Sequence, residues 1–72
     1  VNLAEWNSNI RVQLGGLLFD NHKYDEAITE MKKGVENFPD NFVINLILGL
    51  SYSQKQKNIE AKKYLMKAVT LN

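Results

Sequence analysis

His22 is the first candidate for acid–base chemistry, because it is the single histidine of the chain and Asp20 and Asp25 lie close to it in sequence. A catalytic general base needs a partner that holds its ring in place and a pocket that receives the substrate. The segment 20–23 is instead made of turn-forming residues, which favours a solvated turn histidine. We therefore predict that the chain is not an enzyme and that it uses no cofactor.

Metal and phosphate chemistry also lack their usual patterns. The chain has no cysteine, and one histidine alone cannot build a zinc site. Asp25, Glu26 and Glu30 fit the beginning of a helix, where carboxylates favour the dipole, and they lack the alternating spacing of a calcium loop. Gly15 and Gly16 are surrounded by neither a P-loop nor a dinucleotide fingerprint. We expect no metal site.

Lysines in the second half of the chain raise the possibility of nucleic-acid binding. Residues 1–41 hold seven acids and four bases, whereas residues 42–72 hold one acid and five bases. The basic residues are Lys55, Lys57, Lys62, Lys63 and Lys67. No arginine is among them and Tyr64 is the one aromatic residue nearby, so a solvated helix face explains them better than an RNA or DNA contact. Nucleic-acid binding is the least favoured of our interpretations.

The length and hydropathy of the chain limit the remaining classes of fold and function. With 72 residues, the chain makes one small domain whose core is marginal without a disulfide or metal. Its longest apolar stretch, Phe42–Leu50, is far shorter than the roughly 20 residues that span a bilayer. No basic start followed by an apolar run marks a secretion signal. The lack of cysteine is compatible with a reducing compartment, so the cytoplasm is the default expectation.

The chain repeats itself at an offset of 34 residues. Identical residues align at apolar and small positions that have helical spacing, which indicates helix faces. The identical pairs are Asn7/Asn41, Ile10/Ile44, Leu14/Leu48, Gly15/Gly49, Glu26/Glu60, Ala27/Ala61, Lys33/Lys67 and Val35/Val69. Two repeated units therefore follow one another along the chain.

Each period contains two apolar stripes with helical spacing, separated by a polar break. In the first period the stripes cover residues 10–18 and 24–38, and Pro39 ends the unit. Asp40 or Asn41 can then cap the next helix. The second period predicts helices over about residues 42–54 and 58–71. The segment 42–50 alone could be a buried strand, but its alignment with the better-patterned segment 8–19 decides for a helix, and we expect that helix to be enclosed on most sides. We predict an all-α fold of about four helices.

This pattern resembles the tetratricopeptide repeat family, with Leu-Gly in the first helix, a central alanine in the second and a closing proline. The residues that carry the resemblance, and that it implies pack the repeats, are Leu14, Gly15, Leu18, Tyr24, Ala27, Pro39, Leu48, Gly49, Tyr52, Ala61, Leu65 and Ala68. Arg11, Met31, Asn45 and Asn58 depart from the family pattern. The resemblance implies a right-handed α-solenoid of antiparallel helical hairpins, with units at residues 8–41 and 42–72, the second truncated at its end.

Residues 1–7 are then either the tail of a preceding helix or an extension of the first one. We expect Trp6 to pack against Ile10 or a neighbouring helix.

The resemblance also implies where a partner binds, because the first helix of each unit lines the concave surface of such arrays. The groove positions carried over from the family are Asn9, Val12, Gly16, Phe19 and Asp20 in the first unit, and Val43, Leu46, Leu50, Ser53 and Gln54 in the second. A peptide or amphipathic helix could bind there by area burial. Alternatively, another helix of the same chain or a second copy covers these residues. Val12, Gly16 and Ile47 offer no charge or amide for a chaperone-type carboxylate clamp.

The resemblance thus implies a protein–protein interaction scaffold, part of a larger repeat protein. The first alternative is a structural module that associates with itself through exposed apolar helix faces. Residues 64–71 are apolar over more than one face, and a single partner helix cannot bury them all. Complete arrays usually finish with a polar-faced helix. We therefore expect that the natural protein continues or that the module forms homo-oligomers.

Overall fold

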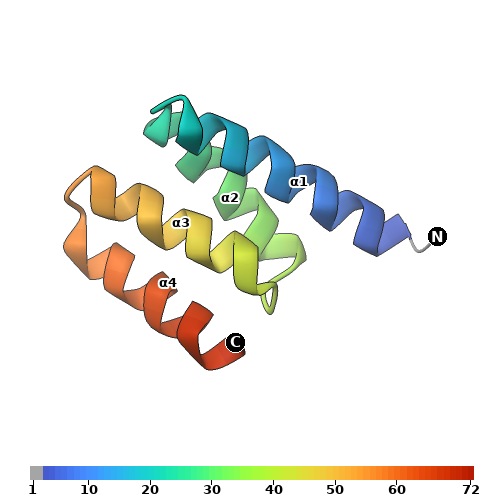
Figure 1. Ribbon diagram of the computed structural model, residues 1–72. Coiled ribbons are helices and arrows are strands. Elements are labelled where there is room, and N and C mark those ends of the chain that lie inside the picture. The colour runs from blue at the N-terminus through green and yellow to red at the C-terminus, as the bar shows by residue number, and fades with distance from the viewer. Residues whose placement is uncertain (1–2) are drawn as a thin grey trace.

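The computed structural model describes residues 3–72, with side chains from Asn7 onward, and consists of helices joined by short turns over that range (Figure 1). The helices are α1 (Leu3–Asp20), α2 (Tyr24–Asn37), α3 (Phe42–Gln54) and α4 (Asn58–Leu71). The all-α prediction is confirmed, and the ambiguous segment 42–50 is helical. Residues 3–7 belong to α1. The predicted packing of Trp6 concerns a side chain outside the described side chains.

The turns between α1 and α2 and between α3 and α4 have the same backbone geometry. His22 and Gln56, which are 34 positions apart, both adopt left-handed conformations with φ of 62° and 61°. The N–H of Lys23 donates to the carbonyl of Leu18 at 2.8 Å, and the N–H of Lys57 donates to that of Tyr52 at 2.9 Å. The 34-residue period of the residue types therefore also appears in the conformation of the backbone.

We expect Gln56→Gly to stabilise the protein by about 0.5–1 kcal/mol. A left-handed residue with a Cβ costs about 1–2 kcal/mol, and glycine removes that cost. Glycine also gives the unfolded chain more conformational freedom, which offsets part of the gain in stability. Urea denaturation followed by circular dichroism measures the change. Ser53→Gly is the control, because Ser53 is helical and exposed, and glycine should cost about 0.5 kcal/mol there. A loss of stability in Gln56→Gly would contradict the assigned turn.

Polar side chains fix the loop between α2 and α3. The Asn41 side chain accepts the N–H of Ile44 at 3.0 Å and so caps α3, as one of the two predicted capping residues. Asn45 Nδ2 donates to the carbonyls of Pro39 (3.0 Å) and Asn41 (2.8 Å). Asn45 is fully buried, and its Oδ1 has no hydrogen-bond partner. The departure of Asn45 from the family pattern thus has a structural role, since an apolar side chain could not hold this loop.

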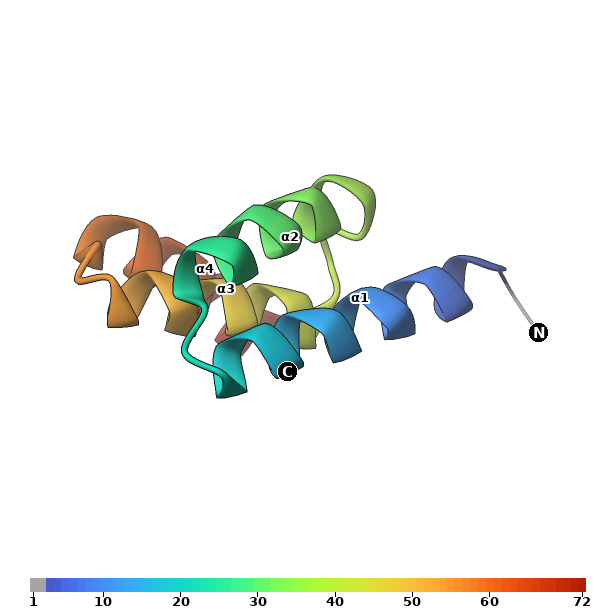
Figure 2. The ribbon, with the colours of Figure 1, turned by 90° about the horizontal axis from the view of Figure 1, so that it is seen from above.

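Helix α3 lies at the centre of the molecule. It packs against α1, α2 and α4, whereas α4 packs against α3 alone among the described helices. Helices α1 and α4 therefore form opposite edges of the molecule (Figure 1). The amino-terminal end of α1 reaches past the other helices (Figure 2). The buried core consists of Met31, Ile44, Leu48, Tyr52 and Ala61. The expectation that α3 is enclosed on most sides is confirmed.

Small residues stand where helices cross. Ala27 and Ala68 are buried, and a Cβ placed on Gly49 would lie 3.0 Å from the backbone nitrogen of Leu65. In the first unit, the side chain of Met31 fills the equivalent space over Gly15. Met31 is 0% exposed, so its departure from the family pattern does not loosen the packing.

Candidate functional site

The predicted groove residues lie along one stripe of α1 and one stripe of α3, and these helices contact each other. We call this surface the α1–α3 face and define it by Asn9, Val12, Gly16, Phe19, Asp20, Val43, Leu46, Leu50, Ser53 and Gln54. Val43 and Leu50 are exposed, while Val12, Phe19 and Leu46 are half-buried. Apolar side chains thus reach solvent along its middle, with polar residues at both ends.

The α1–α3 face has room for an occupant beside α1. A Cβ built on Gly16 would meet no atom within 4 Å, so the surface is open at this position. The ring of Phe19 is fixed by an edge-to-face contact with Tyr24, with 5.3 Å between centroids. Asp20 is the one charged residue in the defined set. This arrangement suits burial of apolar area and offers no cation to an anionic ligand.

A second surface was not predicted from the sequence. It is hollowed between α1 and α2 over a volume of about 650 Å³, continuing into a smaller hollow of about 450 Å³. We call it the α1–α2 cleft, and it is lined by Asn7, Ile10, Arg11, Leu14, Leu18, Asp25, Glu26, Thr29, Glu30, Asn37 and Phe38. Its apolar lining comes mainly from the α1 stripe that sequence reasoning assigned to repeat packing.

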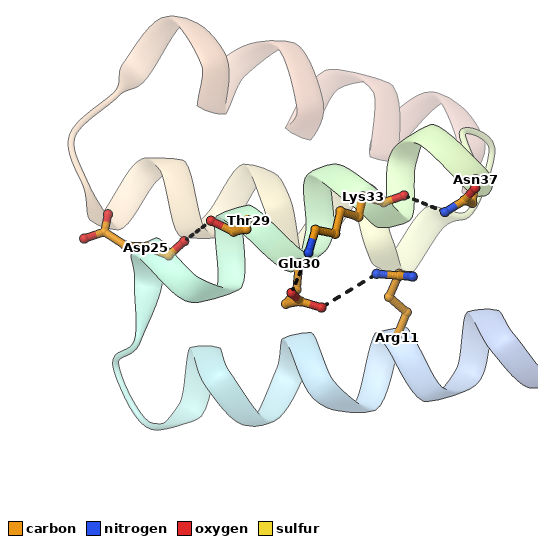
Figure 3. Close-up of polar contacts among 6 residues, drawn as sticks. All are labelled: Arg11, Asp25, Thr29, Glu30, Lys33 and Asn37. Carbon is orange, nitrogen blue, oxygen red and sulfur yellow. Dashed lines mark hydrogen bonds and ion pairs between the residues drawn. The ribbon is translucent and has the colours of Figure 1, made fainter.

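One ion pair among the described residues connects the two walls of the α1–α2 cleft, and others flank it. Glu30 on α2 lies 3.7 Å from Arg11 on α1 and 3.4 Å from Lys33 (Figure 3). The hydroxyl of Thr29 donates to the carbonyl of Asp25 (Figure 3). The Asp25 carboxylate lies 3.3 Å from Lys55, the residue that follows α3. Such partly exposed pairs contribute little stability, about 0–1 kcal/mol each, and they leave Glu26 as the cleft carboxylate without an ion pair among the described residues.

Equivalent positions of α1 and α3 differ sharply in exposure. Ile10 and Leu14 are 48% and 39% exposed, whereas Ile44 and Leu48 are both 0% exposed. A Cβ on Gly34 of α2 would touch Ile44 at 3.0 Å, so α2 covers this part of α3. Among the described residues, no helix covers the corresponding part of α1. Leu14, which the sequence assigns to repeat packing, is therefore partly exposed to solvent.

No catalytic arrangement emerges from the described side chains. His22 is exposed in its turn, and its Nδ1 lies 2.7 Å from the hydroxyl of Tyr24. Burial, followed by the nearby Tyr64 and Glu60, raises the pKa of Tyr52, so its hydroxyl stays protonated at neutral pH. Among the side chains described, those of residues 7–72, no group of three or more His, Cys, Asp or Glu could hold a metal ion. No described helix is long and apolar enough to cross a membrane.

A family model of the tetratricopeptide repeat matches residues 44–72, which comprise most of α3 and all of α4. Residues 44–72 are a tetratricopeptide repeat. The α1–α2 hairpin shares its period and turn geometry with this tetratricopeptide repeat. No curated protein and no solved structure matched the chain. Tetratricopeptide repeats act in general as protein–protein interaction modules and are generally non-enzymatic scaffolds.

Proposed function

We propose that the chain is a non-enzymatic scaffold that binds a peptide or helix of a partner protein on the α1–α3 face. The observation that carries the proposal is the pattern of exposure on α3. This helix is apolar nearly all round, and its exposed large apolar side chains, Val43 and Leu50, both belong to the α1–α3 face. Solvent-facing apolar side chains on an otherwise enclosed helix favour a binding surface.

Binding on this face would rest on area burial. Each Å² of apolar surface removed from water contributes about 25 cal/mol before the cost of ordering the ligand. Asp20, at the end of α1, would favour a cationic group at one end of the ligand. We therefore expect an amphipathic segment whose apolar residues face Leu46 and Leu50. As part of a larger repeat protein, the module would hold one segment of such a partner.

A displayed random library of peptides about 15 residues long, near the length at which isolated helices begin to form, tests the proposal. Selected peptides are titrated into the isotopically labelled chain, and amide shift changes locate the contact. Leu50→Asp should weaken binding at least about tenfold, equivalent to about 1.4 kcal/mol, because it places a charge in the apolar middle of the face. Circular dichroism checks that the variant stays folded.

Met66→Asp is the matched control. Met66 is 59% exposed on α4, which packs against α3 alone among the described helices, so a charge there should leave peptide affinity unchanged. Shift changes confined to residues outside the α1–α3 face would contradict the proposal. Equal affinity of the wild-type chain and Leu50→Asp for every selected peptide would also contradict it.

A further inference from the structure

We propose that the chain associates head to tail with copies of itself, with α4 of one copy docked on the α1–α2 cleft of the next. This inference goes beyond the proposed peptide site, because it uses the opposite edges of the molecule and not the α1–α3 face. It rests on an interface already present inside the chain, the packing of α2 on α3.

The α2–α3 interface serves as a template for the proposed contact. Within the chain, α2 covers Ile44 of α3, and Ile28 and Val35 of α2 pack against the core. The repeat makes α1 equivalent to α3. Ile10 and Leu14 of α1 are exposed, whereas the equivalent residues of α3, Ile44 and Leu48, are covered. Among the described residues, no helix of the α2 type therefore covers the α1–α2 cleft.

Helix α4 is such a helix, because the repeat makes it equivalent to α2. Val69 stands at the position of Val35, yet it is 75% exposed, whereas Val35 is half-buried against α3. Met66 and Ile59 on the same helix are 59% and 86% exposed. Helix α4 thus carries uncovered apolar side chains, and it lies at the edge of the molecule opposite α1 (Figure 1).

Charge complementarity selects α4 of another copy as the occupant. The α1–α2 cleft carries Asp25, Glu26 and Glu30, and Figure 3 shows Glu30 held by Arg11 and Lys33. Asp25 pairs with Lys55, while Glu26 enters no ion pair among the described residues. Helix α4 carries Lys62, Lys63 and Lys67 and a single acid, Glu60. Opposite charges at the rim steer association and disfavour wrong pairings.

Lys62 is the lysine best placed to reach Glu26 at the rim of the cleft. It stands at the position equivalent to Ile28, which packs toward α3 in the template. Its methylene stem can cover the side chain of Leu14 while its ammonium extends to Glu26 of the neighbouring copy. Pairing of two α4 helices would instead bring lysines together. The contact is therefore heterologous, and repeating it builds an open chain of copies.

Sedimentation velocity of the 72-residue chain over a concentration series tests the proposal. An interface of one helix on one cleft is small, so we expect a weak, reversible association with a dissociation constant on the order of 100 µM. The sedimentation coefficient should rise with concentration and should rise less at high salt. A wild-type chain that stays monomeric up to about 1 mM would overturn the proposal, since that concentration is roughly tenfold above the expected dissociation constant.

A mixing experiment separates head-to-tail contact from other modes. Leu14→Asp disables the cleft and Val69→Asp disables α4, so each variant alone should be monomeric. Their mixture retains one intact pair of faces and should form a dimer and nothing larger. Self-association of Val69→Asp alone, or a mixture without dimers, would overturn the proposal. Leu50→Asp, on the α1–α3 face, is the control and should associate like the wild-type chain.

Charge reversal provides a second test that does not alter the apolar side chains. Glu26 and Lys62 are both exposed, so their substitution should leave the fold intact. Glu26→Lys and Lys62→Glu should each weaken association about tenfold or more, because like charges then meet at the rim. The double variant restores opposite charges and should recover most of the association. Failure of the double variant to recover would overturn the proposed contact between α4 and the cleft.

Discussion

Leu48→Ala is expected to lower the free energy of unfolding by about 3 kcal/mol. Leu48 is 0% exposed and packs in the core with Met31, Ile44 and Tyr52. Removal of a buried leucine side chain loses its transfer free energy and leaves a cavity that the surrounding helices refill only in part. Small domains have total stabilities of roughly 5–10 kcal/mol, so this variant should lose a large share of its stability.

Leu14→Ala is the matched control, because the repeat places Leu14 at the position equivalent to Leu48. Leu14 is 39% exposed, so alanine should cost about 1 kcal/mol or less there. Both variants are compared by urea denaturation at low protein concentration, where self-association contributes nothing. Equal losses in the two variants would contradict the structure, since they would require the same burial of both leucines.

The contrast between Leu14 and Leu48 also marks what the sequence can predict. Self-alignment at one period predicts helices and turns, because these depend on local spacing and on residues such as Pro39. It treats Leu14 and Leu48 as the same, because they are identical and have similar neighbours along the chain. Their exposure differs because α2 lies beside α3 and no described helix lies in the same way beside α1.

Asn45 shows a second limit of the sequence. A polar residue within an apolar helix looks like a defect in the packing pattern. Its amide in fact holds the loop carbonyls of Pro39 and Asn41, which approach it only when α2 and α3 are in place. A partner in the folded loop is not visible from residue type alone. Ser51 differs, because it is also fully buried but its hydroxyl donates to the carbonyl of Ile47 one turn earlier in the same helix, a local partner.

The candidate surfaces differ in how far the sequence could foresee them. The α1–α3 face came from family resemblance, and its binding role stays a prediction. The α1–α2 cleft was missed because Ile10 and Leu14 form a regular stripe, and such a stripe normally indicates a buried face. Exposure of these residues follows from the position of α1 at the edge of the fold. One usable signal was the uneven charge of the two halves, because Glu26 and Lys62 lie on the two surfaces that we propose to pair.

Gly49→Ala is expected to destabilise the protein by about 1–2 kcal/mol, although alanine favours helices by about 1 kcal/mol over glycine. A Cβ at this position would lie 2.7 and 2.8 Å from side-chain carbons of Leu65 and 3.0 Å from its backbone nitrogen. The leucine side chain can change its rotamer, but the α4 backbone can move only by opening the interface with α3. Crowding therefore outweighs the gain in helix propensity.

Gly16→Ala makes the same chemical change in α1 and should change the stability of the protein in the opposite direction. Its Cβ meets no atom within 4 Å, so only the helix propensity changes and stability should rise by about 1 kcal/mol. For a domain of this size, 1 kcal/mol corresponds to roughly 4–8 °C in the melting temperature, so thermal denaturation resolves the two variants. If Gly49→Ala melted above the wild-type chain, the close approach of α3 and α4 at Leu65 would be wrong. The sign of the difference thus tests the helix crossing itself, because both substitutions have the same intrinsic effect on a helix.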